Sequence, residues 1–244
     1  MAGRLSLLGA GRQTAWTPLS VSGLNFWMDF SDADTMFTDA GTTKVTTNDD
    51  KVYQVNDKSG NNNTAIQTTE ANRPLYKTNA LNGLSVLNFD GTSSWLQISV
   101  STAQTPITVF LAAYRTYLTY GAYLGQQADN FPLLRNWGAK IEVYVSSGTA
   151  INSSLWGNSS GHVVLSVTHA SDGGRLELFN KTTSYSSNDT VSGFYGNFEK
   201  IGCTTNANQK STGNMYEILI YNSVLSQADR ETVATYLMTK WGIS

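Results

Sequence analysis

The chain has 244 residues, of which 40% are hydrophobic and 14% are charged, and its formal net charge at pH 7 is −2. An average soluble protein has about 25% charged residues, so Asn, Ser, Thr and Gly supply much of the polarity here. The sequence has no cluster of Lys and Arg, which argues against nucleic acid as the main partner. This length allows one sizeable core, and no charged block or Pro-rich hinge divides it.

Residues 1–20 are Gly-rich and lack the periodicity of a helix or strand, so we expect an extended tail ahead of a domain over residues 21–244. The apolar run 5–8 is too short for a signal peptide, and no segment is long enough to span a membrane. We therefore expect neither the common secretory route nor membrane insertion. The tail is predicted to anchor the domain to a partner protein through Arg4, Leu5, Leu7, Leu8 and Arg12. The alternative is that the tail folds back on its own domain.

Short apolar segments separated by turn residues recur between residues 23 and 222 and predict ten or more strands. The segment 107–114, ITVFLAAY, is apolar on both faces, as expected of a central strand that is covered on two sides. The other predicted strands lie within 23–30, 85–91, 95–99, 122–127, 131–137, 140–145, 162–169, 174–180, 199–204 and 214–222. Many short strands at such spacing are typical of a β-sandwich or jelly roll.

The only long helix is predicted at about residues 226–241, where Ser226 is a favourable N-cap and Gly242 a favourable end. One apolar stripe along it consists of Val233, Leu237 and Trp241. The preceding strand, 214–222, is apolar on both of its alternating faces. We therefore expect one face in a core between two sheets and the other against the helix.

Three stretches of the sequence carry a resemblance to a known family. They are VNDKSGNNNTAIQ (55–67), RPLYKTNALNGLSVLNFDGTSSWL (73–96) and EILIYNSVLSQADRETVATYLMTKWG (217–242). The chain resembles the concanavalin A-like lectin/glucanase superfamily, in particular the laminin-G-like jelly-roll modules of tailed phages and bacterial surface proteins. The resemblance spans about residues 23–242 and implies an all-β, two-sheet antiparallel jelly-roll sandwich with one C-terminal helix. Such modules often have an aromatic residue where Val55 stands here.

Motifs for catalysis are missing from the sequence. Glucanases of this superfamily have a Glu-x-Asp-x-x-Glu strand that places two carboxylates beside the scissile bond, and this chain has no such run. His162 and His169 bound one predicted strand and are expected to be strand-end residues, without a Gly-x-Ser-x-Gly motif. Cys203 is the only cysteine and is expected to be a buried structural thiol. We therefore expect no enzyme activity and no catalytic residue.

Oxygen-bearing residues alternate in the loop DKSGNNN, at Asp57, Ser59, Asn61 and Asn63. This alternation is one way to surround a calcium ion, although Thr68 stands where a calcium loop would supply a bidentate Glu. The alternative is that these side chains form turns by bonding to nearby backbone groups. Apart from this calcium hypothesis, we expect no cofactor.

Aromatic residues near loop tips suggest a sugar site, because sugar C–H faces stack on rings while hydroxyls bond to amides and carboxylates. The predicted carbohydrate-binding residues are Trp137, Asn136, Trp156, Asn158 and Tyr195. The alternative is that each loop aromatic fills a small hydrophobic cluster or a subunit contact. Trp27 and Trp241 are instead expected in the core.

The resemblance and the composition together favour a non-enzymatic structural protein of a tailed-phage virion, such as a capsid decoration, spike or fibre component. Its tail would bind other virion proteins, and its lectin-like domain would face outward and bind host-surface polysaccharide. We expect it in several copies or as a homo-oligomer. The alternative is a carbohydrate-binding or adhesion module outside a bacterial cell or on its surface, and a glycoside hydrolase ranks below both.

Overall fold

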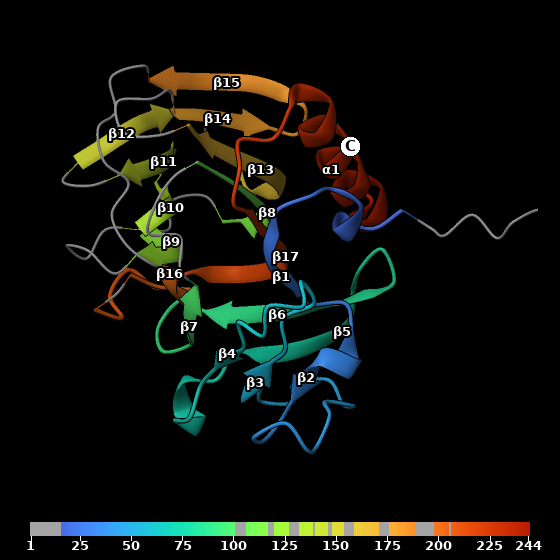
Figure 1. Ribbon diagram of the computed structural model, residues 1–244. Coiled ribbons are helices and arrows are strands. Elements are labelled where there is room, and N and C mark those ends of the chain that lie inside the picture. The colour runs from blue at the N-terminus through green and yellow to red at the C-terminus, as the bar shows by residue number, and fades with distance from the viewer. Residues whose placement is uncertain are drawn as a thin grey trace, which may run out of the picture.

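Two antiparallel sheets pack around a shared core in the computed structural model, and one C-terminal helix lies against the outside of one of them (Figure 1). The predicted two-sheet sandwich with a terminal helix is confirmed. The structure describes residues 16–100, 106–116, 120–126, 132–138, 140–145, 148–153, 159–170, 176–188, 198–204 and 206–244. No helix within these ranges combines the length and the apolar composition needed to cross a membrane.

The first sheet has eight strands in the order β15-β14-β13-β8-β17-β6-β5, with β1 also paired to β17. Its strands are β1 (Leu24–Asp29), β5 (Leu75–Leu81), β6 (Leu84–Asp90), β8 (Ile107–Arg115), β13 (Gly161–His169), β14 (Leu176–Asn180), β15 (Thr183–Asn188) and β17 (Thr212–Tyr221). The central strand β8 is covered on both sides, as predicted. Val109 and Leu111 belong to the core between the sheets, whereas Phe110 and Ala112 belong to the layer under the helix.

The second sheet has nine strands in the order β12-β11-β10-β9-β16-β7-β4-β3-β2. Its strands are β2 (Met36–Phe37), β3 (Gln54–Val55), β4 (Ala65–Ile66), β7 (Leu96–Val100), β9 (Tyr120–Gln126), β10 (Pro132–Trp137), β11 (Lys140–Val145), β12 (Gly148–Ser153) and β16 (Phe198–Ile201). Three short 3₁₀ helices are η1 (Pro18–Ser20), η2 (Ala33–Thr35) and η3 (Glu70–Asn72). Strands β2 to β5, β12 and β15 were not predicted, because they are either very short or polar and give no clear period-2 pattern.

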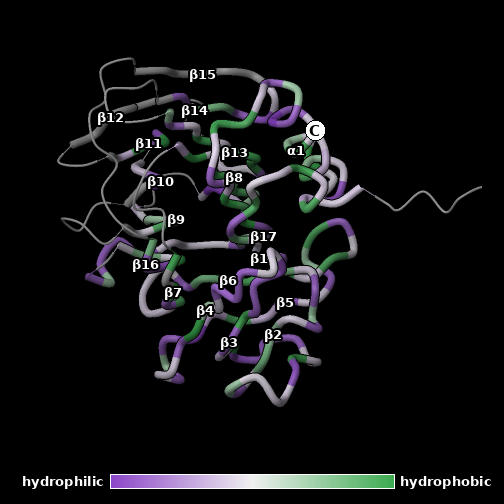
Figure 2. Tube along the Cα trace, in the orientation of Figure 1, coloured by the Kyte–Doolittle hydropathy of each residue, from purple (hydrophilic) through white to green (hydrophobic). Residues whose placement is uncertain are grey.

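The helix α1 (Gln227–Trp241) begins and ends as the sequence predicts. Ser226 Oγ accepts a hydrogen bond of 3.1 Å from the Asp229 amide, and Gly242 ends the helix with a φ of 62°. The predicted stripe is fully buried against the first sheet, and Figure 2 shows hydrophobic segments gathered where β8, β13 and α1 meet. Burial of this stripe therefore attaches the helix to the sheet.

A bulge in β17 changes the alternation that the sequence predicts. The pairing of β17 with β8 shifts register between Met215 and Glu217. Met215, Ile218 and Ile220 lie in the core between the sheets, and Tyr216, Leu219 and Tyr221 lie in the layer under the helix. Both faces are buried as expected, but Met215 is on the face opposite to the one that strict alternation assigns to it. Because Glu217 bonds to residues of α1, the neighbours Tyr216 and Glu217 both face the helix.

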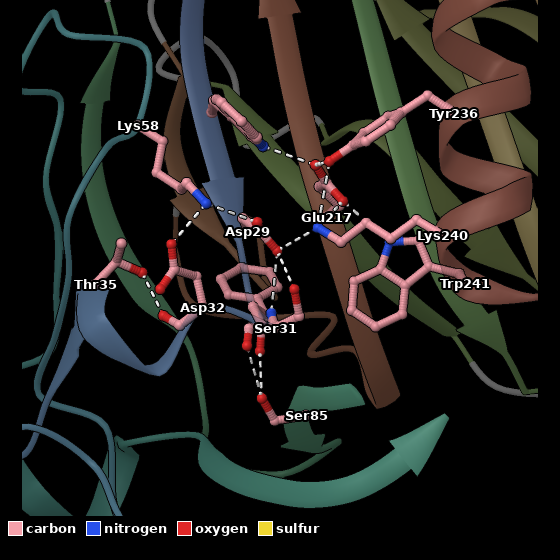
Figure 3. Close-up of polar contacts among 12 residues, drawn as sticks. Asp29, Ser31, Asp32, Thr35, Lys58, Ser85, Glu217, Tyr236, Lys240 and Trp241 are labelled. Carbon is pink, nitrogen blue, oxygen red and sulfur yellow. Dashed lines mark hydrogen bonds and ion pairs between the residues drawn. The ribbon is translucent and has the colours of Figure 1, made fainter. Parts of the chain in front are cut away.

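Glu217 is fully buried and accepts hydrogen bonds from two elements (Figure 3). Its Oε1 accepts from Trp27 Nε1 on β1 at 2.7 Å and from the Tyr236 hydroxyl on α1 at 2.9 Å. Its Oε2 accepts from Lys240 Nζ at 2.8 Å and from Trp241 Nε1 at 3.0 Å, both on α1. Both carboxylate oxygens are thus bonded, which offsets the cost of burying the charge.

Asp29 on β1 lies directly across from Glu217, and Lys240 Nζ joins the two carboxylates with a 2.6 Å contact to Asp29 Oδ1. Lys58 Nζ contacts Asp29 at 2.8 Å and Asp32 at 2.6 Å. Burial and the charge of Asp29 raise the pKa of Glu217. Burial acts in the same direction on Asp29, but Lys240 and Lys58 outweigh it and hold the pKa of Asp29 below its usual value. We call Asp29, Lys58, Glu217 and Lys240 the ionic latch.

We expect Lys240→Met to destabilise the protein by about 3–5 kcal/mol, because it leaves two buried carboxylates without their shared ammonium group. Chemical denaturation monitored by tryptophan fluorescence measures the change. Lys44→Met is the matched control, since Lys44 pairs with Asp34 on the surface, where the side chains are 51% and 80% exposed. Lys44→Met should lower the free energy of unfolding far less than Lys240→Met does. Equal losses for the two variants would contradict a structural role for the ionic latch.

The ionic latch also predicts a pH dependence through Asp29. Its pKa in the folded protein lies below the usual 3.8, so its stabilising effect is complete above that pH and is lost as the pH falls through the folded value. Asp29→Asn should therefore cost about 3 kcal/mol at pH 7 and progressively less below pH of about 4. Denaturation curves at pH 7 and at about pH 2.5 measure this difference, and a gap that does not change with pH would contradict the assignment.

Candidate functional site

The ionic latch contains two carboxylates, Asp29 and Glu217, that lie directly across from each other on neighbouring strands, as a catalytic pair could. A retaining glycosidase holds two carboxyl groups about 5–5.5 Å apart with access to the substrate. Here Asp29 is 4% exposed, Glu217 is 0% exposed, and Lys240 bonds to both. Their oxygens are used to attach α1 to the sheet. This geometry assigns the pair a structural role, and the absence of enzyme activity stays a prediction.

The outer face of β9, β10 and β11 carries a second group of aromatic and charged side chains. Residues of these strands alternate between the core and this face, so that Leu134, Ile141 and Val143 point into the core. On the outer face, Trp137 lies between Tyr120 on β9 and Lys140 on β11 as their direct cross-strand partner. Arg135 lies between Ala122 and Glu142 in the same way. We call the set of Tyr120, Arg135, Trp137, Lys140, Glu142 and Tyr144 the outer-face site.

Two aromatic rings are exposed in the outer-face site. Trp137 is 37% exposed and Tyr120 is 54% exposed, and their ring centroids are 4.6 Å apart at an angle of 80°. Trp137 is the last residue of β10, at a tight turn where Gly138 has a φ of +60°. A left-handed conformation next to a two-residue connection is typical of a β-hairpin and favours glycine. The rings are therefore held at the end of a hairpin rather than on a long loop.

Arg135 packs against the Trp137 indole. Its guanidinium carbon lies 3.8 Å from the centroid of Trp137 and 4.4 Å from that of Tyr144. Its Nε and Nη2 contact Glu142 Oε2 at 2.7 and 2.6 Å, and its Nη1 donates to Gln209 at 2.9 Å. Arg135 and Glu142 are 7% and 4% exposed. The buried pair fixes the indole from one side and leaves little net charge beneath it.

A second arginine holds the hairpin from inside the sandwich. Arg115, on β8 of the other sheet, is 1% exposed and donates from Nη2 to the Gly138 carbonyl at 2.8 Å. Its Nε donates to Asn136 Oδ1 at 2.9 Å, and Asn136 Nδ2 donates to the Thr116 carbonyl at 2.7 Å. Arg115 thus connects the two sheets directly behind Trp137.

The predicted carbohydrate-binding residues are not all in one place. Trp137 lies in the outer-face site, whereas Asn136 is 3% exposed and bonded on the inner side of the sheet. Adjacent residues of a strand face opposite sides, so Asn136 cannot share a surface with Trp137. Trp156, Asn158 and Tyr195 lie outside the described residues. Tyr120 was missed, although its place just before the predicted strand 122–127 was a usable signal.

The loop of the calcium hypothesis is filled by its own hydrogen bonds. Asp57 Oδ1 accepts from the amides of Trp27 and Ser59 at 2.9 and 2.8 Å. Asn61 and Asn63 donate from their side-chain amides to the Asn25 carbonyl at 3.2 and 2.9 Å. These contacts favour the turn alternative. In the part of the chain that the structure describes, no group of three or more His, Cys, Asp or Glu side chains lies close enough to hold a metal ion.

The remaining sequence candidates have structural positions. Cys203 is fully buried, and burial raises the pKa of its thiol to about 12, which confirms the buried-thiol prediction. His162 and His169 lie at or next to the ends of β13, as predicted, and His162 Nδ1 is 2.8 Å from the Tyr216 hydroxyl. The predicted core positions of Trp27 and Trp241 are confirmed, with exposures of 5% and 0%.

Part of the predicted N-terminal tail contacts the domain. The Trp16 ring lies 5.2 Å from that of Tyr236 on α1, and the Tyr221 hydroxyl donates to the Pro18 carbonyl at 3.2 Å. Residues 16–20 therefore pack on their own domain. The predicted anchoring residues Arg4, Leu5, Leu7, Leu8 and Arg12 lie outside the described residues.

Comparison with known proteins gives likenesses of fold. No family model matches the chain, and no curated protein sequence matches it either. Domain 4 of AbnA, a GH43 extracellular arabinanase from Geobacillus stearothermophilus solved in complex with arabinotriose, has a TM-score of 0.56 and 13% identity, covering 86% of this chain and 98% of that one. Trypanosoma rangeli sialidase in complex with sialic acid has a TM-score of 0.53 and 12% identity over 90% of this chain.

The chain spans only 33% of the length of that sialidase. A third similar structure, the HCR/D W1238A mutant, has a TM-score of 0.58 and 11% identity, covering 90% of this chain and 55% of that one. At such identities the likeness shows the fold alone. The chain therefore has a β-sandwich fold that also occurs in proteins solved with bound sugars.

Proposed function

We propose that this chain is a non-enzymatic, lectin-like domain that binds glycans at the outer-face site. The observation that carries the proposal is the pair of exposed rings Tyr120 and Trp137, which contact each other while Trp137 packs against the buried Arg135–Glu142 pair. Rings that are held rigidly lose little conformational entropy on binding and offer the apolar surface on which sugar C–H faces stack. The fold likeness to proteins solved with saccharides supports this function.

The geometry indicates how a sugar would be held. Arg135 covers one side of the Trp137 indole, so the more exposed ring of Tyr120 is the main stacking surface and Trp137 is its rigid neighbour. Sugar hydroxyls are then within reach of the polar groups that border the rings, including the exposed ammonium of Lys140. We propose no bond cleavage at this site, because its carboxylate, Glu142, is paired with Arg135.

We expect Tyr120→Ala and Trp137→Ala each to weaken glycan binding about tenfold or more, because each removes a rigid aromatic contact. A glycan array followed by calorimetry on the strongest ligand measures the effect. Trp16→Ala is the matched control, since Trp16 has nearly the same exposure, 36% against 37%, but lies beside α1. Binding that neither outer-face substitution changes would sink the proposed site.

We further propose that the domain belongs to a tailed-phage virion, as a decoration, spike or fibre component with its lectin-like face outward. The resemblance to jelly-roll modules of such particles and the low content of charged residues, 14%, support this assignment. The N-terminal residues would bind other virion proteins, and several copies would give the particle multivalent contact with host polysaccharide.

Mass spectrometry of purified virus particles checks the location. We expect peptides of this chain in intact particles, in an amount that corresponds to several copies per particle. Recovery from a bacterial cell envelope, with none in particles, would instead indicate the alternative of an adhesion module. That result would leave the proposed glycan site untouched.

A further inference from the structure

We infer that the outer-face site selects acidic glycans, meaning saccharides that carry a carboxylate or sulfate group, and that Lys140 is the specificity-determining residue. This inference rests on the proposed function and adds the class of ligand. It follows from the position of Lys140 relative to the two exposed rings and from the balance of charges around them.

The hairpin places Lys140 beside the aromatic pair. Trp137 and Lys140 face each other across the two-residue turn between β10 and β11, and Trp137 also faces Tyr120 on β9. Directly opposite residues of antiparallel strands have Cβ atoms about 4.5–5.5 Å apart on one face of the sheet. Tyr120, Trp137 and Lys140 therefore form a row about 10 Å long across three strands. A sugar stacked on the rings has the ammonium group of Lys140 at its edge.

The charges around this row are unbalanced. Arg135 is paired with Glu142, so these two groups nearly cancel. Lys140 is exposed, and no ion pair to it is found among the described residues. Among the described residues of the outer-face site, two cations, Arg135 and Lys140, thus stand against one carboxylate, Glu142, in a chain whose net charge is −2.

This arrangement favours an anionic ligand over its neutral form. Two opposite charges about 4 Å apart attract each other modestly in water and more strongly where a bound ligand excludes part of the water. We therefore expect the acidic form of a glycan to bind about five- to tenfold more tightly than a matched neutral form. The preference should decline at high ionic strength, because salt screens exposed charges.

Two matched pairs of ligands test the inference by calorimetry on the whole chain. One pair is an oligogalacturonate and its fully methyl-esterified form, and the other is a sulfated galactan oligosaccharide and its desulfated form. The pairs distinguish carboxylate from sulfate as the preferred anion. The variants are Lys140→Gln, Lys140→Glu and the control Lys51→Gln, since Lys51 forms a β-bridge with Leu75 of β5 and pairs with Glu70. Thermal unfolding confirms that each variant is folded.

The expected result is tighter binding of the acidic member of at least one pair. Lys140→Gln should remove this preference, Lys140→Glu should reverse it, and Lys51→Gln should keep it. Three results would overturn the inference. The original chain could bind both members of each pair equally or bind neutral glycans alone, or Lys140→Gln could keep the preference. In each of these cases sensitivity to Tyr120→Ala would still support the proposed function, so the two failures are distinguishable.

Discussion

The buried carboxylate of Glu217 is the constraint on which the arrangement of the structure depends. A charge without exposure to water is tolerated only when its oxygens are bonded, and here the donors come from β1 and α1. Lys240 extends the contacts to Asp29, and Lys58 extends them to Asp32 in η2's N-cap. Segments far apart in the sequence are therefore fixed by one group of charges. The hydrophobic stripe of α1 supplies affinity for the sheet, and the charges determine one position for the helix.

The ionic latch is connected to the outer-face site through β17, β8 and Arg115. β17, which carries Glu217, pairs with β8 from Met215 to Tyr221, and β8 ends at Arg115. Arg115 crosses between the sheets to the Gly138 carbonyl, in the turn that displays Trp137. The rings are therefore supported from within by a buried guanidinium group and from beside by Arg135. A surface that is held from two sides keeps its shape without a ligand, which is what a binding site of modest size requires.

The sequence alone predicts the structural features that depend on a local residue pattern. Local sequence patterns correctly predicted the central strand β8 and the cap and apolar stripe of α1. They also predicted the core positions of Trp27 and Trp241. The ionic latch was not predictable, because Asp29 and Lys240 are distant in sequence and meet only when α1 packs against the sheet that contains β1. The prediction that groups Asn136 with Trp137 rests on their proximity in sequence, whereas the structure places the two side chains on opposite faces of β10. In a strand, the neighbour in space is the cross-strand residue, and this is why Tyr120 was missed.

The bulge in β17 lies where the strand changes partners. Its first residues, 212–215, pair with β6, whereas residues 217–221 pair with β1, and the register shift against β8 falls between the two. The strand therefore behaves as two short pieces joined in series, each with its own phase of inward and outward side chains. A slip of pairing in one piece need not pass to the other. The bulge thereby separates the half that packs against α1, residues 217–221, from a register slip in residues 212–215, which pair with β6.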